Sequence, residues 1–182
     1  MNQLQQQCLD AFPKWLAALS DDATAMASLL SAESIPVDAR RYVAGAVGYL
    51  YKSLDLIPDG VEDLGYLDDA FVLRVAARVA LREAPASKEA DIRGILARLS
   101  AEAEVIERFL EADYARLETY VRNLKKGAVR GRTVEEIVSD PAVRSEFLRD
   151  VTNWAKVYAC PSFESDEKTL IKLQSFLHSR LP

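Results

Sequence analysis

Apolar residues recur with helical spacing along most of the chain. In the segment 3–19 they fall on one face, as in an amphipathic helix. The positions on that face are Leu4, Leu9, Phe12, Leu16 and Leu19. Pro13 interrupts the segment, so we expect a kink there or the first turn of a second helix. Asp21 or Asp22 is then expected to cap a short helix that ends near Leu30.

The next apolar segment predicts a central, buried helix over about 34–53. Ser34 provides a start signal, and after Arg41 the segment is apolar on nearly every side. Gly45 and Gly48 each lower the helix propensity by about 1 kcal/mol. The close approach of a neighbouring helix would be the simplest compensation, so we expect one there.

An acidic connector follows this helix. Pro58 and Gly60 predict a turn at 57–60. A helix is expected from about 67 to 83, with two aspartates in its first turn, where carboxylates interact favourably with the helix dipole. Three arginines recur every four residues along the border of its inner face. The carboxylates of the connector are Asp55, Asp59, Glu62, Asp63, Asp68 and Asp69, and the arginines are Arg74, Arg78 and Arg82.

The segment 88–125 has no proline and carries apolar residues at alternating spacings of four and three, the pattern of a coiled-coil seam. The seam consists of Ile92, Leu96, Leu99, Ala103, Ile106 and Leu110, and after a break at Asp113 it resumes with Leu117, Tyr120 and Leu124. We expect one helix of about 50 Å over this segment. Its seam serves either partner docking and oligomerisation or the interior of an antiparallel bundle.

The last third of the chain predicts shorter elements. A basic turn contains Lys125, Lys126, Arg130 and Arg132. Thr133 and Glu136 have the spacing of a capping box. One helix is expected from the Asp140-Pro141 pair to about 159, and a last one from Ser165 or Asp166 to about 179. We find no convincing alternation of period two, so the fold class is all-α, a helical bundle. N-terminal helices (1–86) are expected to pack with a C-terminal helical region (87–182) as one continuous domain.

The connector carries a recognisable pattern. It reads Tyr49-Leu-Tyr-Lys-Ser-Leu-Asp55-Leu-Ile-Pro-Asp59 and, after residues 60–63, Leu64-Gly-Tyr-Leu-Asp-Asp-Ala70. This resembles the signature P-x-D-L-I-P-D-x-I-P-x-L-G-x-L-D-D of the YkvA-type domain of unknown function, over about 37–83, with a module core at 34–84. Three residues differ from those that the family usually has: Ser53 stands in place of Pro, Gly60 in place of a large apolar residue, and Glu62 in place of a second Pro. The resemblance implies a small helical domain and brings no established activity.

Composition narrows the function classes. The 182 residues have a net charge of -5, which disfavours general binding to nucleic acid and to anionic membranes. The longest uncharged apolar run, 42–51, is too short to span a bilayer, which needs roughly 20 residues. No signal peptide is evident. Cys8 and Cys160 are far apart and are expected to be free thiols, so we expect a cytoplasmic protein.

Two candidate sites follow from the charged residues. Asp55, Asp59, Asp68 and Asp69 could gather around Mg²⁺ or Ca²⁺, which prefer oxygen ligands. The alternative is structural: hydrogen bonds to connector N–H groups, a helix cap, or ion pairs with arginines. Ligand spacing of the EF-hand type is absent. The basic turn contacts either phosphates or the acidic connector, or is simply solvated.

Catalytic chemistry has little support in the sequence. The chain has one histidine, His178, which excludes most triad and zinc-histidine schemes, and no phosphate-binding glycine loop is present. We therefore assign no catalytic residue and expect a non-enzymatic interaction or adaptor protein. Its partner, or a second copy, would bind through the long helix. One alternative is a divalent-metal protein with hydrolytic activity at the connector. Another is peripheral membrane attachment near Tyr49–Tyr51.

Overall fold

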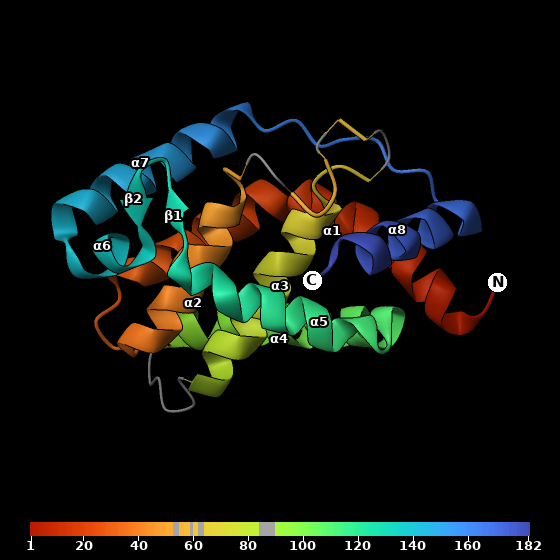
Figure 1. Cartoon of the computed structure of the whole chain (residues 1–182), viewed down its shortest axis with the longest axis horizontal. Helices are drawn as coiled ribbons and strands as arrows, with labels where there is room; N and C mark the ends of the chain where they lie inside the picture. The colour runs from red at the N-terminus through yellow and green to blue at the C-terminus, as the bar shows by residue number, and fades with distance from the viewer. Residues whose placement is uncertain (53–54, 59, 62–63, 84–89) are drawn as a thin grey trace.

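The computed structural model describes residues 1–52, 55–58, 60–61, 64–83 and 90–182. These residues form helices almost throughout, and the all-α prediction is confirmed (Figure 1). The helices are α1 (Gln3–Ser28), α2 (Val37–Tyr49), α3 (Leu67–Glu83), α4 (Ala90–Leu110), α5 (Asp113–Asn123), α6 (Val134–Ser139), α7 (Pro141–Val157) and α8 (Glu167–Arg180). Two 3-10 turns, η1 (Leu29–Ser31) and η2 (Leu124–Lys126), and a hairpin of β1 (Ala128–Val129) and β2 (Arg132–Thr133) complete the described elements.

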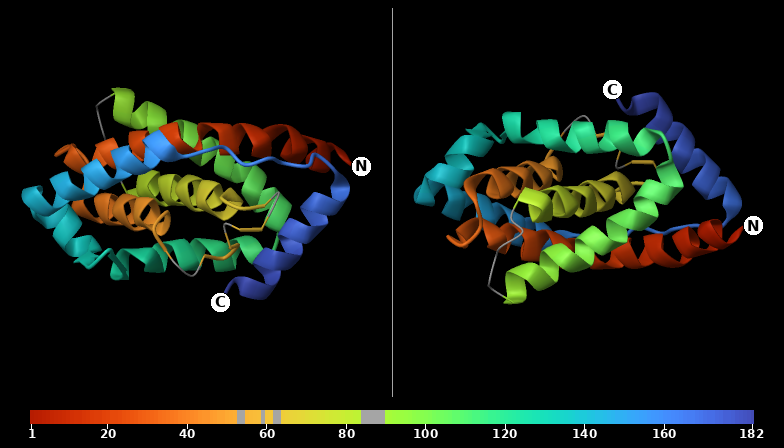
Figure 2. Two further views of the ribbon diagram at one scale, coloured as in Figure 1. Left: turned by 90° about the horizontal axis from the view of Figure 1, so that it is seen from above. Right: turned by 90° about the horizontal axis from the view of Figure 1, so that it is seen from below.

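Helices α2 and α3 lie at the centre of the bundle, and α1, α4, α5 and α7 surround them (Figure 2). Helix α3 packs against α2, α4, α1 and α5, and from Leu67 to Ala77 all its side chains are buried. Its Phe71 meets Phe12 of α1, with ring centroids 5.1 Å apart. Burying a large apolar side chain contributes about 1.5–3 kcal/mol, so α3 is the element on which the bundle is built.

Helix α1 continues through Pro13, so the expectation that a second helix begins at this residue is wrong. A proline inside a helix costs about 3 kcal/mol, because it removes one hydrogen bond and crowds the carbonyl group four residues earlier. Phe12 and Leu16, on either side of it, are fully buried. Their burial contributes at least as much as the proline costs. The expected cap at Asp21 or Asp22 is also wrong, because both lie inside α1.

The single helix predicted over 88–125 is wrong as well. Helix α4 ends at Leu110, α5 begins at Asp113, and the chain turns back sharply between them (Figure 2). Glu111 adopts a left-handed conformation at this corner, with φ 51°. The reversal lets both halves of the seam pack on α3. The seam residues whose burial in this core is described are Leu96, Leu99, Ala103, Ile106, Leu110, Leu117 and Leu124.

The expected close neighbour of the two glycines in α2 is present. A Cβ atom on Gly45 would lie 2.8 Å from the backbone carbonyl carbon of Leu124. A Cβ atom on Gly48 would lie 2.3 Å from Cγ2 of Val129. The neighbour is not a long helix, however, but the turn η2 and the strand β1.

The predicted start signals of the last helices are confirmed. Thr133 and Glu136 form a reciprocal capping box at α6. Asp140 caps α7, and Asp166 caps α8. Within the described part of the chain, no helix combines the length and apolar character that crossing a membrane requires.

Candidate functional site

The acidic connector contains a buried hydrogen-bond network around Asp68. This carboxylate is fully buried, and its Oδ2 accepts hydrogen bonds from the Tyr49 hydroxyl at 2.6 Å and from the Ile57 N–H at 3.0 Å. The Tyr49 oxygen accepts in turn from the Leu56 N–H at 2.7 Å. Burial and the neighbouring carboxylate raise the pKa of Tyr49 far above its ordinary value. The network ties the end of α2 and the connector to the start of α3.

The other three predicted metal ligands differ in where they lie and in how deeply they are buried. Asp69 is buried in the first turn of α3, and Asp55 is half-buried. Asp59 lies outside the described residues. Within the described part, no group of three or more His, Cys, Asp or Glu side chains is arranged to hold a metal ion. Because Asp59 belongs to the predicted set, the Mg²⁺ or Ca²⁺ site stays a prediction.

The basic turn folds back onto its own neighbours. Arg132 pairs with Asp150 of α7, and Arg130 lies 3.7 Å from the same carboxylate. Lys125 places its Nζ 4.7 Å from the centre of the Tyr42 ring, and Lys126 is exposed. Among the described residues, the carboxylate that these arginines contact thus belongs to α7 rather than to the acidic connector.

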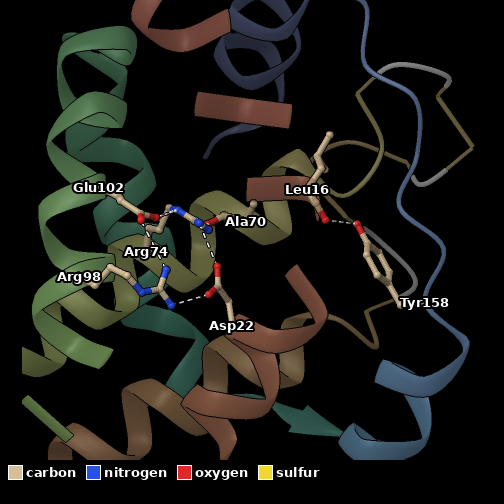
Figure 3. A network of polar contacts seen from close by, with 7 residues as sticks. All are labelled: Leu16, Asp22, Ala70, Arg74, Arg98, Glu102 and Tyr158. Carbon is tan, nitrogen blue, oxygen red and sulfur yellow. Dashed lines mark hydrogen bonds and ion pairs between the residues drawn. The ribbon is translucent and has the colours of Figure 1, made fainter. Parts of the chain in front are cut away.

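A second buried network crosses the bundle at Arg74, whose side chain is fully buried (Figure 3). Its Nη2 donates to Asp22 Oδ2 at 2.9 Å, and its Nε donates to Glu102 Oε2 at 2.7 Å. Arg98 donates to the second oxygen of Asp22 at 2.6 Å. The Arg74 guanidinium also lies 4.3 Å from the centre of the Trp15 ring. The network joins α1, α3 and α4.

The four ionic groups of this network compensate one another. Burial lowers the pKa of Arg74, and Glu102 and Asp22 oppose that shift. Two arginines face two carboxylates, so the network as a whole is neutral. A buried charge is tolerated only with such pairing. The sequence marked Arg74 as one of a row of arginines and offered Asp68 or Asp69 as its partner, but it did not indicate Asp22 or Glu102.

A groove lies above this network, between α1 and α4, with a cavity volume of about 810 Å³. Trp15 and Arg74 belong to its floor. Along α1 it extends from Gln3 to Ala18, about 22 Å at the helical rise per residue. The residues that line the groove are Gln3, Gln6, Gln7, Asp10, Ala11, Lys14, Trp15, Ala18, Arg74, Arg98, Glu102 and Arg108.

The rim of the groove carries two cations that the network does not neutralise. Lys14 and Arg108 are exposed, and neither has a carboxylate partner in the part of the chain that the structure describes. Arg108 donates instead to the amide oxygen of Gln7 at 3.1 Å. Of the lining residues that the structure describes, Asp10 is the one carboxylate outside the network, and it accepts from the Gln6 amide at 2.9 Å. The groove can therefore attract an anionic group.

Comparison with known proteins assigns one part of the chain. A family model described as a protein of unknown function (DUF1232) matches residues 39–74, from the start of α2 to the middle of α3. The match includes Tyr49, Asp68 and Arg74. Comparisons with curated proteins and with solved structures gave no match. The matched family brings no activity with it, and the resemblance to the YkvA-type domain stays a prediction.

Proposed function

We propose that this chain is a non-enzymatic interaction protein that holds an acidic segment of a partner protein in the groove between α1 and α4. The observation that carries the proposal is the pair of rim cations, Lys14 and Arg108, which lack carboxylate partners among the described residues. The proposed partner surface lies on the outer faces of α1 and α4, and not on the apolar seam that was expected to serve over 88–125. The described apolar seam residues are used in the core, so they are not free for a partner.

Charge complementarity supports an acidic occupant. The network of Asp22, Arg74, Arg98 and Glu102 is neutral, so among the described lining residues Lys14, Arg108 and Asp10 set the charge of the rim, with one positive charge in excess. The whole chain has a net charge of -5. A locally positive groove on an acidic protein favours an acidic segment and gives orientation as well as attraction.

The shape of the groove supports a peptide segment rather than a flat surface. Ala11, Trp15 and Ala18 supply apolar contact along α1, and Gln3, Gln6 and Gln7 supply amide groups that donate and accept hydrogen bonds. A length of about 22 Å accommodates some six extended residues or four helical turns. The suitable segment combines acidic side chains with small apolar ones.

Binding of labelled peptides tests the proposal. The probes are fluorescein-labelled peptides of about 15 residues that alternate Glu or Asp with Ala and Leu, each beside its Gln or Asn counterpart. We expect fluorescence anisotropy to report saturable binding of the acidic peptides alone. The double variant Lys14→Glu/Arg108→Glu should weaken it by at least about tenfold, since each reversed charge costs roughly 1 kcal/mol.

The matched control is Arg149→Glu/Lys172→Glu, which reverses two exposed cations on α7 and α8, away from the groove. It changes the net charge by the same amount and should leave binding within about twofold. Equal losses in the two double variants would overturn the proposal, because attraction would then be non-specific. Saturable self-association in sedimentation, lost in the Lys14→Glu/Arg108→Glu variant alone, would make a second copy of this chain the occupant instead.

A further inference from the structure

A second hollow lies at the other side of the molecule, where the end of α2 meets the β1–β2 hairpin and α7. Its cavity volume is about 570 Å³, within the size range of small-molecule sites. Tyr51, Tyr66 and Trp154 form aromatic walls, and Lys52 and Arg130 lie on its rim. We call this site the aromatic hollow. None of its lining residues belongs to the groove between α1 and α4.

The aromatic walls are held in place by other side chains. Trp154 packs on Tyr158 with ring centroids 5.1 Å apart, and Tyr66 meets the same ring edge-on at 5.4 Å. The Tyr158 hydroxyl donates to the Leu16 carbonyl of α1 at 2.8 Å (Figure 3). Tyr51 packs against Phe147 at 6.4 Å. These rings are therefore positioned without a ligand, which reduces the entropic cost of binding one.

Two residues of the aromatic hollow adopt the left-handed backbone conformation, which is unfavourable for residues other than glycine. Tyr66 has φ 67° and Arg130 has φ 50°. A non-glycine residue in this left-handed region costs about 1–2 kcal/mol, and Asn is tolerated better than most. Arg130 and Gly131, with φ 79°, are the two central residues of the hairpin turn, where Asn-Gly is the favoured pair. Strained residues of this kind cluster at binding sites.

The unusual arginine in the turn brings a guanidinium to the aromatic hollow. Arg130 lies 4.6 Å from the centre of the Tyr51 ring. Asp150 is closer to Arg132, at 2.5 Å, than to Arg130, at 3.7 Å. Lys52 also lines the hollow, with its Nζ over the Tyr120 ring, where it donates to the Tyr120 hydroxyl at 3.1 Å. Among the described residues here, Arg130, Arg132 and Lys52 thus lie near one carboxylate, Asp150, and Arg130 is less compensated than Arg132.

We infer that the aromatic hollow binds a small planar aromatic molecule that carries one anionic group, a carboxylate or a phosphate. The ring stacks on the aromatic walls, where such contacts contribute beyond the buried area. The anionic group pairs with Arg130 and Lys52, since a guanidinium makes strong charge-assisted hydrogen bonds to either group. This inference is independent of the proposed peptide groove.

Nuclear magnetic resonance of the full-length chain tests this inference. The two tryptophans, Trp15 in the groove and Trp154 in the aromatic hollow, give separate indole N–H signals. The probes are indole-3-acetate and adenosine 5′-monophosphate, beside the uncharged indole-3-acetamide and adenosine and the ring-free acetate and phosphate. We expect a charged aromatic probe to shift the Trp154 signal saturably and to leave Trp15 unchanged. The carboxylate and phosphate arms identify the anion.

The variant Arg130→Asn removes the cation and keeps the turn, because Asn readily adopts the left-handed conformation. We expect the affinity for the charged probe to fall at least about tenfold, the loss of one charged hydrogen bond. Arg130→Lys should retain part of it, and Arg149→Asn, which replaces an exposed arginine elsewhere on α7, should change nothing. Equal binding by the Arg130→Asn variant would overturn the inference. So would an unmoved Trp154 signal with every probe at 10 mM.

Discussion

The two buried polar networks on α3 differ in what they connect. At the start of the helix, Asp68 accepts hydrogen bonds from Tyr49 and Ile57, which are close to it in sequence. Two turns later, Arg74 pairs with Asp22 on α1 and Glu102 on α4, which are far from it. The first network closes a bend between consecutive helices. The second joins three helices and lies under an open groove. Buried charge on one helix thus serves a local turn in one place and a long-range assembly in the other.

The largest expected effect is the loss of the long-range network in Arg74→Met. Asp22, which is 2% exposed, would then keep only Arg98 as its partner. Removing one member of a buried ion pair costs about 3–5 kcal/mol, because the remaining charge stays buried. We expect the free energy of unfolding, measured by urea denaturation, to fall by that amount.

Two comparisons sharpen this result. Arg78→Met removes a more exposed pair with Glu107 and should cost about 1 kcal/mol or less. The double variant Asp22→Asn/Arg74→Met no longer contains the uncompensated carboxylate. Its free energy of unfolding should therefore fall by less than the sum of the two single-variant decreases. Full additivity would show that the pair is not coupled.

The local network should matter somewhat less. Tyr49→Phe deprives Asp68 of one donor and the Leu56 N–H of its acceptor. An unsatisfied buried polar group costs about 1–3 kcal/mol, so thermal and urea unfolding should show a loss of that size. Tyr120→Phe removes a hydroxyl that accepts from the exposed Lys52, and it should lose less than about 1 kcal/mol. Similar losses of stability in both variants would show that the buried Tyr49–Asp68 contact contributes no more than the exposed hydrogen bond of Tyr120.

Variants of the connector aspartates address the predicted metal site. If Asp68 serves the turn alone, calorimetric titration with Mg²⁺, Ca²⁺ and Mn²⁺ should give no heat that Asp68→Asn abolishes. Saturable heat in the native chain that disappears in Asp55→Asn and Asp68→Asn would instead show that the connector binds a divalent metal ion. Thermal unfolding with and without millimolar metal provides a second measurement of the same question.

A smaller effect on stability should distinguish Gly48 in α2 from Gly94 in α4. In Gly48→Ala the new methyl group would overlap Val129, and overpacking costs about 1–3 kcal/mol, partly offset by better helix propensity. Gly94→Ala meets nothing within 4 Å, so it should stabilise the chain by about 0.5–1 kcal/mol. Opposite signs in the two urea midpoints are the expected outcome. A gain in both would mean that the contact with β1 is not tight.

The smallest expected effect concerns acid stability at the corner of α4 and α5. The hydrogen bond from His178, at 2.8 Å, and the one from Arg116 lower the pKa of Asp113 below its usual 3.8. A lowered pKa stabilises the folded state above the unfolded pKa, and this contribution is lost as the pH falls through the folded value. In Asp113→Asn the unfolding midpoint should therefore decrease less steeply as the pH falls below about 4. Identical acid profiles would contradict the assignment.

Sequence reasoning succeeded where the cause is local. The caps at Thr133, Asp140 and Asp166, the start of α3 and the crowded glycines depend on neighbouring residues or on helix periodicity, and all are present in the structure. The second helix expected at Pro13 and the single helix over 88–125 were wrong, because packing on α3 outweighed the local preference in both.

The groove could not be predicted from the sequence. Asp22 and Arg74 are 52 positions apart, and no local pattern links a carboxylate on one helix to an arginine on another. The aromatic hollow was only partly indicated. The sequence marked Arg130 and Tyr51 separately, and the fold of the hairpin brings them together.

The central claim is that the groove between α1 and α4, rather than the apolar seam of 88–125, is where a partner binds. The most direct measurement is a titration of the full-length chain with the acidic peptide, followed through the two indole N–H signals. We predict that the Trp15 signal shifts saturably while Trp154 stays in place, and that Lys14→Glu/Arg108→Glu abolishes the shift. An unmoved Trp15 signal at peptide concentrations that saturate the anisotropy would contradict the account.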